Sequence, residues 1–295
     1  MEQLMKSVRS FLFVPGNRAA WIDKAADSCA DALILDLEDS VPLAEKAQAR
    51  ETVRSSLEGL SRRKQRTWVR INRSPHMYDF EDLLAVVGPH VEGIVLSKPA
   101  GPEDVDTASS LLAEVEHRKG LQIGSTLLLP ILETARSMQF AYEIAQRPRV
   151  LGLTGLAAKN GDVARALGVG WTPEGRESLF LKSRVVMAAR AAAKQPIGGL
   201  WQQVHDLDGL EKACEEDRLL GMRGQFLLHP SNVAVCNRVF SPSPEEVAYY
   251  RGMVEALEHA QAAGRASIIY AGEHIDIAHV TTAREILALA ASFQD

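Results

Sequence analysis

The chain has 295 residues, of which 46% are hydrophobic and 24% charged, an ordinary composition for a globular protein with a large core. Its net charge of −5 argues against a nucleic-acid or membrane-surface partner. No apolar run approaches the ~18 residues of a membrane span, the first residues lack the core of a secretory signal, and the cysteines form no CxxC pair. We therefore expect a cytoplasmic protein without a zinc site or disulfide framework.

Short apolar runs alternate along the chain with stretches of helical spacing. Such runs are typical of strands that are buried on both faces, as in parallel sheets. We predict strands over Phe11–Val14, Ala32–Leu37, Thr67–Ile71, Gly93–Leu96, Thr126–Leu132, Val150–Thr154, Ile197–Trp201 and Gln225–Leu228. We predict helices over Arg18–Cys29, Ala44–Leu57, Phe80–Val87, Pro102–Lys119, Ala135–Gln146, Leu179–Ala193 and Leu207–Leu220.

This alternation implies parallel βαβ units, and eight repeats favour a closed (β/α)8 TIM barrel over residues 1–240. An open doubly wound sheet is the alternative, but the turn after the first strand lacks the GxGxxG pattern that such a sheet usually carries. After Phe240 we predict a helix over Glu245–Ala263, a β-ribbon within Gly264–Gly272 and a helix over Thr281–Ala291. This C-terminal extension, residues 241–295, is expected to pack under the barrel or to contact a neighbouring subunit.

Charged residues follow several predicted strands at the point where each strand ends. Side chains at the carboxyl ends of barrel strands meet on one face and form the active site of such enzymes. The sequence therefore predicts an enzyme before it predicts a reaction. The residues concerned are Asp36, Glu38 and Asp39 after the second strand, Arg70 in the third, Lys98 after the fourth, Glu133 after the fifth and His229 after the eighth.

Glu133 and Asp162 are the candidate metal ligands, because carboxylates after adjacent barrel strands can hold one hard cation, for which we predict Mg²⁺. Alternatively, Glu133 caps the following helix and Asp162 lies in a solvated loop. Arg70 is costly to bury unless it meets an anion, which is either a substrate oxygen or Glu38.

For each of the remaining charged candidates, a structural or surface role is the alternative to a functional one. Lys98 is either a Schiff-base lysine or, as the neighbouring acids favour, a charge that neutralises them. His229 is either functional or a hydrogen-bonded structural histidine. Arg9 and Arg18 are candidate phosphate partners near the barrel mouth, or ordinary surface residues.

Several motifs are spread over nearly the whole chain, and together they resemble the HpcH/HpaI aldolase–citrate lyase family, most closely its citrate lyase beta-subunit-like CoA-ester lyases. These motifs are Arg9–Gly16, Ala32–Val41 with Lys46 and Arg50, Arg70–Asn72, Glu133–Ala135, Asp162 with Leu167 and Gly168, His229-Pro230 and Phe240–Pro242.

The resemblance implies a (β/α)8 barrel, assembled as a homotrimer or hexamer, that binds Mg²⁺ through Glu133 and Asp162. Such enzymes cleave or form a carbon–carbon bond in a 3-hydroxyacyl-CoA such as citryl-, malyl- or citramalyl-CoA. The products are an acyl-CoA, for example acetyl-CoA, and a 2-oxo acid.

The resemblance also implies roles for single residues. Arg70, with Glu38, belongs to the catalytic set, and Asp36 and Lys98 lie around the substrate. Asp276, in the segment Gly272–His279, is the implied base, reaching the active site of a neighbouring subunit.

Two departures from the family pattern leave the acyl group open: Gly161 and Gln203 stand where acids are usual. Two other activities remain open. One is a class II aldolase acting on free 2-oxo acids, and the other is an acyl-carrier-dependent subunit of a citrate lyase complex. The segment with Asp276 favours the CoA-ester lyase, because the simple pyruvate aldolases of this family lack that extension.

Overall fold

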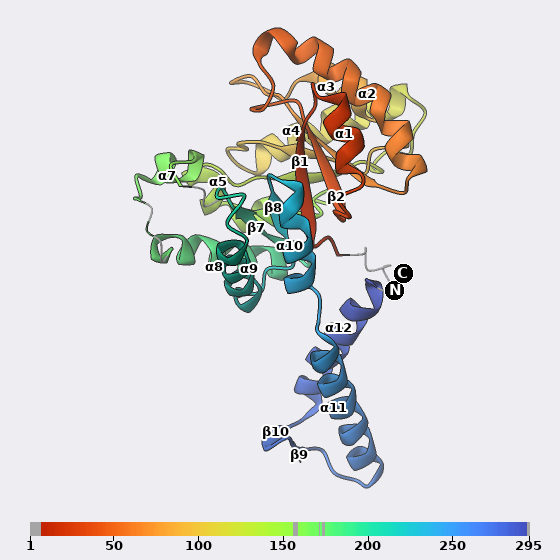
Figure 1. The fold of residues 1–295 in the computed structure, drawn as a ribbon, viewed down its shortest axis with the longest axis vertical. Coiled ribbons are helices and arrows are strands. Elements are labelled where there is room, and N and C mark those ends of the chain that lie inside the picture. Colours follow the sequence, from red (N-terminus) through yellow and green to blue (C-terminus); the bar gives the residue numbers. More distant parts are fainter. Residues whose placement is uncertain (1–6, 156–158, 171, 173–174, 294–295) are drawn as a thin grey trace. The chain divides into compact units, whose positions relative to one another are not determined.

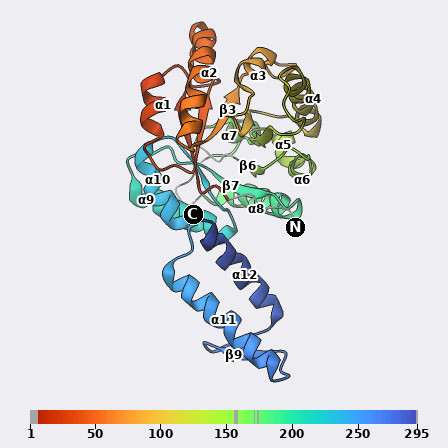
Figure 2. The same ribbon diagram turned by 90° about the vertical axis from the view of Figure 1, so that its right-hand side faces the viewer.

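The computed structural model describes residues 7–155, 159–170, 172 and 175–293. The chain divides into two compact units, Val8–Asn237 and a C-terminal unit that starts at Arg238. Figures 1 and 2 show the first unit as strands surrounded by helices and the second as two long helices with a small ribbon. No helix within the described ranges has both the length and the apolarity that crossing a membrane requires.

The first unit is built on the strands β1 (Ser10–Pro15), β2 (Ala32–Asp36), β3 (Arg66–Ile71), β4 (Gly93–Leu96), β5 (Leu127–Pro130), β6 (Gly152–Thr154), β7 (Gln195–Leu200) and β8 (Gln225–Leu227). Neighbouring strands are parallel, in the order β5-β4-β3-β2-β1-β8-β7-β6. The end strands β5 and β6 meet through the parallel bridges Leu128–Val150 and Ile131–Thr154, which close the ring. The predicted (β/α)8 barrel is confirmed.

Helices follow the strands and cover the outside of the barrel (Figure 1). They are α1 (Ala19–Ala25), α2 (Lys46–Arg62), α3 (Phe80–Val86), α4 (Pro102–Arg118), α5 (Ala135–Gln139), α6 (Ala141–Ala145), α7 (Asp162–Leu167), α8 (Arg176–Ala191), α9 (Leu207–Leu220) and α10 (Val233–Phe240). Two short 3-10 turns, η1 (Leu43–Glu45) and η2 (Pro230–Asn232), precede α2 and α10.

The inside of the barrel is filled by apolar side chains from every second strand residue. Phe11 packs edge-on against Trp68 and Phe226, with ring centroids 6.3 and 5.5 Å apart. Gly93 makes room for this cluster, because a Cβ at this position would lie 2.3 Å from the Trp68 ring. The core therefore closes the barrel below its carboxyl end and leaves that end for polar side chains.

The C-terminal unit consists of α11 (Pro244–Ala262), an antiparallel ribbon of β9 (Ile268–Tyr270) and β10 (Glu273–Ile275), and α12 (Ile277–Ser292). Its own small core contains Met253, Leu257, Ile275, Val280 and Ala283. Ser243 and Glu246 form a capping box at the start of α11.

The structure corrects the predicted elements at several places, and among the helices that were not predicted is α7. The ribbon lies later than Gly264–Gly272, because Ala271 and Gly272 have positive φ angles and form its turn. Helix α12 starts at Ile277 rather than Thr281, because Asp276 caps it. The predicted helix over residues 135–146 is interrupted at Phe140. Helix α10 was not predicted, since its valines have low helix propensity.

Candidate active site

The barrel brings the charged residues that follow its strands to one end, because all eight strands are parallel. Strand alternation decides which of these side chains point inward. Three of them stand two residues after a member of the interior core: Asp36 after Ile34, Arg70 after Trp68, and Glu133 after Ile131.

Asp36 and Arg70 are direct partners on the neighbouring strands β2 and β3 and form a bidentate ion pair. Arg70 Nε and Nη2 each donate to a different Asp36 oxygen at 2.7 Å. The same carboxylate accepts the backbone N–H groups of Glu38 and Ser40 at 2.9 and 3.0 Å. Burial alone would raise the pKa of Asp36, but these bonds hold it below its usual value. Asp36 thus holds Arg70, whose guanidinium carbon lies 5.0 Å from the Phe13 ring centroid.

Glu38 connects Arg70 to Lys98. Its Oε2 lies 3.0 Å from Arg70 Nη1, and its Oε1 accepts a hydrogen bond from Lys98 Nζ at 2.7 Å. Asp39 and Asp162 oxygens lie 3.3 and 3.7 Å from the same Nζ. Partial burial would lower the pKa of Lys98, but the bond to Glu38 and the surrounding acids raise it well above its usual value. An ammonium held this firmly argues against a Schiff base.

The backbone of Lys98 is held in an uncommon conformation, with φ at +50°. Its N–H donates to Glu133 Oε1 at 3.3 Å, and its carbonyl accepts a hydrogen bond from Arg73 Nη1. These contacts fix the loop after β4 next to the end of β5. Such strain in a non-glycine residue is typical of functional sites.

Glu133 is the buried acid of the site with the fewest partners. It is 5% exposed, and within the described residues the Lys98 N–H is its one hydrogen-bond donor. Burial raises the pKa of Glu133 to about 7, against the opposing charges of Lys98 and Arg70. A buried carboxylate with so little compensation favours a bound cation.

Asp162 is the first residue of α7 and is partly buried. Its Oδ1 accepts a hydrogen bond from Arg165 Nη2, and its Oδ2 faces Lys98. In the described part of the chain, no group of three or more His, Cys, Asp or Glu side chains is arranged to hold a metal ion by itself. Mg²⁺ requires fewer protein ligands than this, since it usually keeps several waters and binds one or two protein carboxylates. Glu133 together with Asp162 fits such an open site.

The sequence motif contains Lys46 but indicates no role for it, and in the structure this residue shapes the loop after β2. Its Nζ donates to the carbonyl oxygens of Leu37 and Glu38 at 2.7 and 2.5 Å and so holds the loop that carries Glu38. The available signal was its place at the start of α2, where acids are normally favoured over bases.

The remaining predicted residues of the barrel lie farther from this cluster or make structural contacts. Arg18 is exposed and precedes α1 in the turn after β1, at the carboxyl end. His229 Nδ1 lies 2.7 Å from Ser231 Oγ and accepts the Ser231 N–H at 3.2 Å, which is a structural capping role.

Arg9 does not lie at the barrel mouth, so that prediction is wrong. It directly precedes β1 and binds Asp31 through its backbone N–H, Nε and Nη2 at 2.7–2.9 Å. A residue before a parallel strand lies at the opposite end of the barrel from the residues that follow it.

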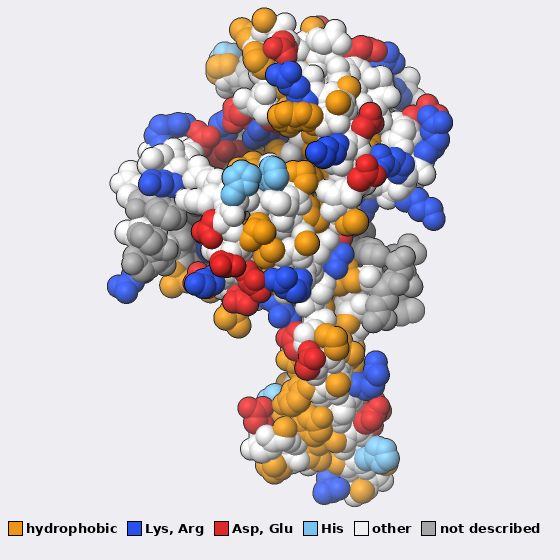
Figure 3. Space-filling model, viewed as in Figure 1, with side chains coloured by type: hydrophobic (Ala, Val, Ile, Leu, Met, Phe, Trp, Pro, Cys, Tyr) orange, Lys and Arg blue, Asp and Glu red, His pale blue; other side chains and the backbone are white. Residues whose placement is uncertain are grey.

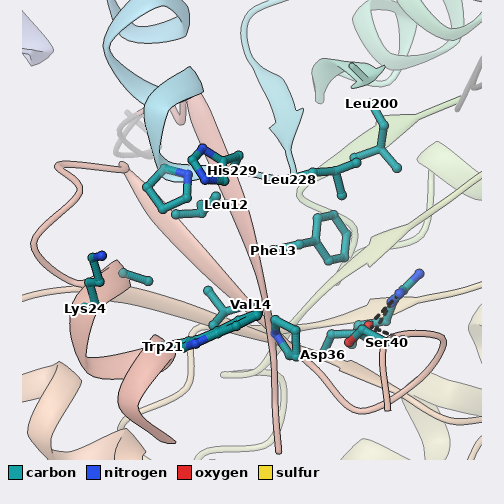
Figure 4. Close-up of a pocket in the computed structure, with 14 residues that line it drawn as sticks. Leu12, Phe13, Val14, Trp21, Lys24, Asp36, Ser40, Leu200, Leu228 and His229 are labelled. Atoms are coloured by element: carbon teal, nitrogen blue, oxygen red, sulfur yellow. Dashed lines mark hydrogen bonds and ion pairs between the residues drawn. The ribbon is translucent and has the colours of Figure 1, made fainter. Parts of the chain in front are cut away.

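A cavity of about 380 Å³ opens beside Arg70 (Figure 4). Phe13, Leu200 and Leu228 form much of its inner wall, together with the Asp36–Arg70 pair. Its volume falls within the range of small-molecule sites, roughly 300–1,000 Å³. The charged cluster therefore has an apolar space next to it.

The sequence model of the HpcH/HpaI aldolase/citrate lyase family matches residues 9–230, which contain the whole of this cluster. The chain belongs to this family. The predicted resemblance is confirmed, and with it the assignment of the enzyme to the carbon–carbon lyases of the HpcH/HpaI aldolase/citrate lyase family.

Three relatives within this family illustrate the likeness. A (3S)-malyl-CoA thioesterase of Cereibacter sphaeroides is 32% identical over 96% of this chain and 94% of its own length. An L-malyl-CoA/beta-methylmalyl-CoA lyase of the same species is 33% identical over 95% and 93%. The structure of protein CitE from Mycobacterium tuberculosis, in complex with magnesium, acetoacetate and coenzyme A, aligns with a TM-score of 0.77, 26% identity and 97% and 98% coverage.

Asp276 lies beyond the residues matched by the family model. It caps α12, accepting the Ala278 N–H at 3.0 Å, and its Oδ1 lies 2.7 Å from His279 Nδ1. The hydrogen bond with His279 lowers the pKa of Asp276. Its carboxylate is therefore ionised at neutral pH, the form that a base requires.

Proposed function

We propose that the protein is a Mg²⁺-dependent lyase that cleaves or forms a 3-hydroxyacyl-CoA such as malyl-, citramalyl- or citryl-CoA. The products of cleavage are an acyl-CoA and a 2-oxo acid. The observation that carries this proposal is the buried, poorly compensated Glu133 beside Asp162 and Arg70. The malyl-CoA lyase and the CitE complex with magnesium and coenzyme A support it.

The proposed metal ligands are Glu133 and Asp162. When bound, Mg²⁺ supplies Lewis acidity at the carboxylate and hydroxyl oxygens of the oxo-acid half of the substrate. Lys98, fixed between Glu38 and Asp162, keeps the acids of the site from repelling one another. Asp36 and Glu38 position Arg70.

Cleavage breaks the bond between C2 and C3 of the thioester. The 3-hydroxyl loses its proton and becomes the carbonyl of the 2-oxo acid, while the bonding electrons pass to the acyl-CoA as an enolate, which then takes up a proton. Arg70 stabilises the negative charge that develops on the thioester oxygen. It uses two of its N–H groups to bind Asp36 and also lines the cavity.

We propose Asp276 of a neighbouring subunit as the base that takes the hydroxyl proton, in a cytoplasmic homotrimer or hexamer. Apolar side chains gather on the visible face of the C-terminal unit (Figure 3). Among this unit's residues, Ile269 is 70% exposed and Ile277, next to Asp276, is 52% exposed. Exposed apolar surface of this kind is typical of protein–protein contacts.

A thioesterase is the second candidate, because the malyl-CoA thioesterase matches this chain over nearly its full length. Both reactions use the same thioester and develop negative charge on its carbonyl oxygen. They differ in the bond that breaks: hydrolysis yields free CoA and a hydroxy acid and leaves the carbon–carbon bond intact.

A product assay tests the proposal. Purified protein is given malyl-, citramalyl- and citryl-CoA with Mg²⁺ or with EDTA, and acyl-CoA, 2-oxo acid and free CoA are quantified. We expect equal amounts of acyl-CoA and 2-oxo acid, lost with EDTA and in Asp162→Ala, and kept in the exposed control Glu58→Ala. If the products are instead free CoA and a hydroxy acid, the protein is a thioesterase rather than a lyase.

Failure on every CoA thioester would contradict the proposal. Turnover of free 2-oxo acids would then indicate the aldolase, and turnover of acyl-carrier thioesters alone would indicate a subunit of a citrate lyase complex.

A further inference from the structure

The loop after β3 contacts the loop after β4 and is itself held by several bonds. Arg73 and Tyr78 form an isolated antiparallel bridge within it, and the Asp79 N–H donates to the Asn72 carbonyl at 2.9 Å. Tyr78 is buried, and the Arg73 guanidinium carbon lies 5.1 Å from the centroid of its ring. Asn72 ties the loop to α3, because its N–H and its Nδ2 both donate to Asp82 Oδ2, at 2.9 and 2.8 Å. The side chains of Arg73 and Tyr78 therefore have defined positions at the carboxyl end of the barrel.

These two side chains bind the carbonyl oxygens of two consecutive residues in the loop after β4. Tyr78 Oη donates to the Ser97 carbonyl at 3.1 Å, and Arg73 Nη1 donates to the Lys98 carbonyl. Burial raises the pKa of Tyr78 above its usual value, so the hydroxyl keeps the proton that it donates. Asp104 Oδ2 lies 3.3 Å from Arg73 Nη1 and orients the guanidinium. Two adjacent peptide groups of this loop are thus held by side chains from outside it.

The peptide group between Ser97 and Lys98 connects Tyr78 to Glu133. Its carbonyl belongs to Ser97 and accepts the Tyr78 hydroxyl, and its N–H belongs to Lys98 and donates to Glu133 Oε1 at 3.3 Å. Because a trans peptide group is planar, its C=O and N–H point in opposite directions, and a bond that fixes one also fixes the other. This N–H is the one hydrogen-bond donor that Glu133 has among the described residues. Tyr78 therefore acts on Glu133 through a single rigid group.

The backbone conformation of Lys98 goes against its local preference and so depends on such contacts. Its φ angle of +50° lies in a region that residues with a long side chain seldom adopt. Pro99 follows it, and the residue before a proline normally has an extended conformation with negative φ. The conformation is therefore maintained by contacts with the rest of the chain, and the bond from Arg73 to the Lys98 carbonyl is one of them.

We propose that Tyr78 is a positioning residue for the metal site. Its hydroxyl orients the peptide group of Ser97–Lys98 so that the N–H holds the Glu133 carboxylate in place for the cation. Arg73 supports this arrangement by holding the next peptide group. The inference rests on the proposed function, since it assumes that Glu133 is a metal ligand, and it assigns a role to two residues that do not line the cavity. A group that orients a metal ligand typically contributes about 10–100-fold to metal affinity or activity.

The test is calorimetric titration of Mg²⁺ into the full chain, with urea unfolding of each variant to measure its stability. Tyr78→Phe removes only the hydroxyl, and we expect it to weaken Mg²⁺ binding about 10-fold. Tyr270→Phe is the matched control, because Tyr270 also donates to a backbone carbonyl, that of Tyr249, at 3.1 Å, but within the C-terminal unit. This control should leave Mg²⁺ affinity unchanged, although it removes the same kind of hydrogen bond.

Arg73 provides a second variant at a position that is only partly buried, so the test does not depend on the folding of Tyr78→Phe. Arg73→Met removes the donor to the Lys98 carbonyl and should also weaken Mg²⁺ binding about 10-fold, whereas Arg73→Lys keeps a donor and should recover part of this loss. Removal of a positive charge would by itself favour a cation. A loss of affinity in Arg73→Met therefore reflects the position of the ligand rather than charge.

Wild-type Mg²⁺ affinity in both Tyr78→Phe and Arg73→Met would overturn the inference and leave the proposed reaction standing. An equal loss of affinity in Tyr270→Phe would also overturn it, because the effect would then follow from stability rather than from the orientation of Glu133. Weakened Mg²⁺ binding in Tyr78→Phe, together with normal binding but no turnover of any thioester by the wild type, would contradict the proposed reaction alone.

Discussion

Two glutamates of this barrel are almost equally buried and yet have opposite environments. Glu116 is 0% exposed and Glu133 is 5% exposed. Glu116 pairs with Arg149 through two bonds of 2.7 and 2.9 Å and also accepts the N–H groups of Gly124 and Thr126. Glu133 accepts one long hydrogen bond, from Lys98.

The pKa values of the two glutamates express this difference. Burial alone would raise both, but the partners of Glu116 lower its pKa from 4.5 to about 2. For Glu133 burial dominates and raises the pKa from 4.5 to about 7. A buried carboxylate whose hydrogen bonds are all satisfied within the chain has a structural role, whereas a buried carboxylate that lacks such partners is a candidate to bind a ligand.

Substitution of Glu133 gives the largest effect expected from this comparison. Glu133→Gln should lower lyase activity on the order of 1,000-fold, because a neutral amide is a poor Mg²⁺ ligand. Its folding stability at pH 7.5 should not fall. Steady-state kinetics and urea unfolding of the same preparation give both values, and wild-type activity in Glu133→Gln would break the comparison.

Substitution of Glu116 by Gln should have the opposite effect: it should lower folding stability and leave activity intact. Glu116→Gln leaves Arg149 without its carboxylate, and breaking a buried pair in this way costs about 3–5 kcal/mol of unfolding free energy. Activity per folded molecule should stay at the wild-type level. A double variant, Glu116→Gln with Arg149→Met, should recover much of the stability, and failure to recover it would show that the pair is not the cause.

The pH dependence of folding stability also distinguishes the two glutamates, since a rise in pH weakens the contribution of Glu133 and a fall in pH weakens that of Glu116. Without metal, Glu133 keeps its proton in the folded chain and loses it in the unfolded chain between pH 4.5 and about 7. Wild-type stability relative to Glu133→Gln should therefore fall by about 3 kcal/mol as pH rises through this window. Glu116 contributes stability above pH 4.5 that is lost as pH falls toward about 2. Urea unfolding in EDTA at a series of pH values measures both, and parallel profiles for wild type and Glu133→Gln would contradict the assignment.

The two arginines of β3, Arg66 at its amino end and Arg70 near its carboxyl end, allow a similar comparison between a structural and a functional ion pair. Arg70→Lys removes the bidentate bond to Asp36 at the carboxyl end and should lower activity about 100-fold. Arg66→Lys changes the pair with Glu92 at the amino end and should leave activity unchanged. Equal losses of activity in both variants would mean that Arg70 acts through the fold alone.

The smallest expected effect is a partial recovery of activity that involves Asp276 of the C-terminal unit. Asp276→Ala and Glu133→Gln should each be inactive, but unfolding and refolding them together in equal amounts should restore about a quarter of wild-type activity if Asp276 serves a neighbouring subunit. No recovery in refolded mixed oligomers would place the base within its own chain or elsewhere.

The sequence alone predicted the barrel and the residues that meet at its carboxyl end, because strand ends and burial follow from local pattern. The contacts between those residues did not follow from that pattern. The two bonds of Asp36 to Arg70 depend on strand register, and the pairing of Lys98 depends on its unusual φ angle. Arg9 was misplaced because its motif suggests a site residue, whereas its position before β1 puts it at the other end.

Calorimetric titration of Mg²⁺ into wild type, Glu133→Gln and Glu116→Gln, below the melting temperature of each, tests the central claim most directly. The environments of the two glutamates predict that wild type and Glu116→Gln bind one ion per chain with similar affinity and that Glu133→Gln does not. Equal binding by wild type and Glu133→Gln would contradict the assignment of Glu133 as the carboxylate that the fold reserves for the metal.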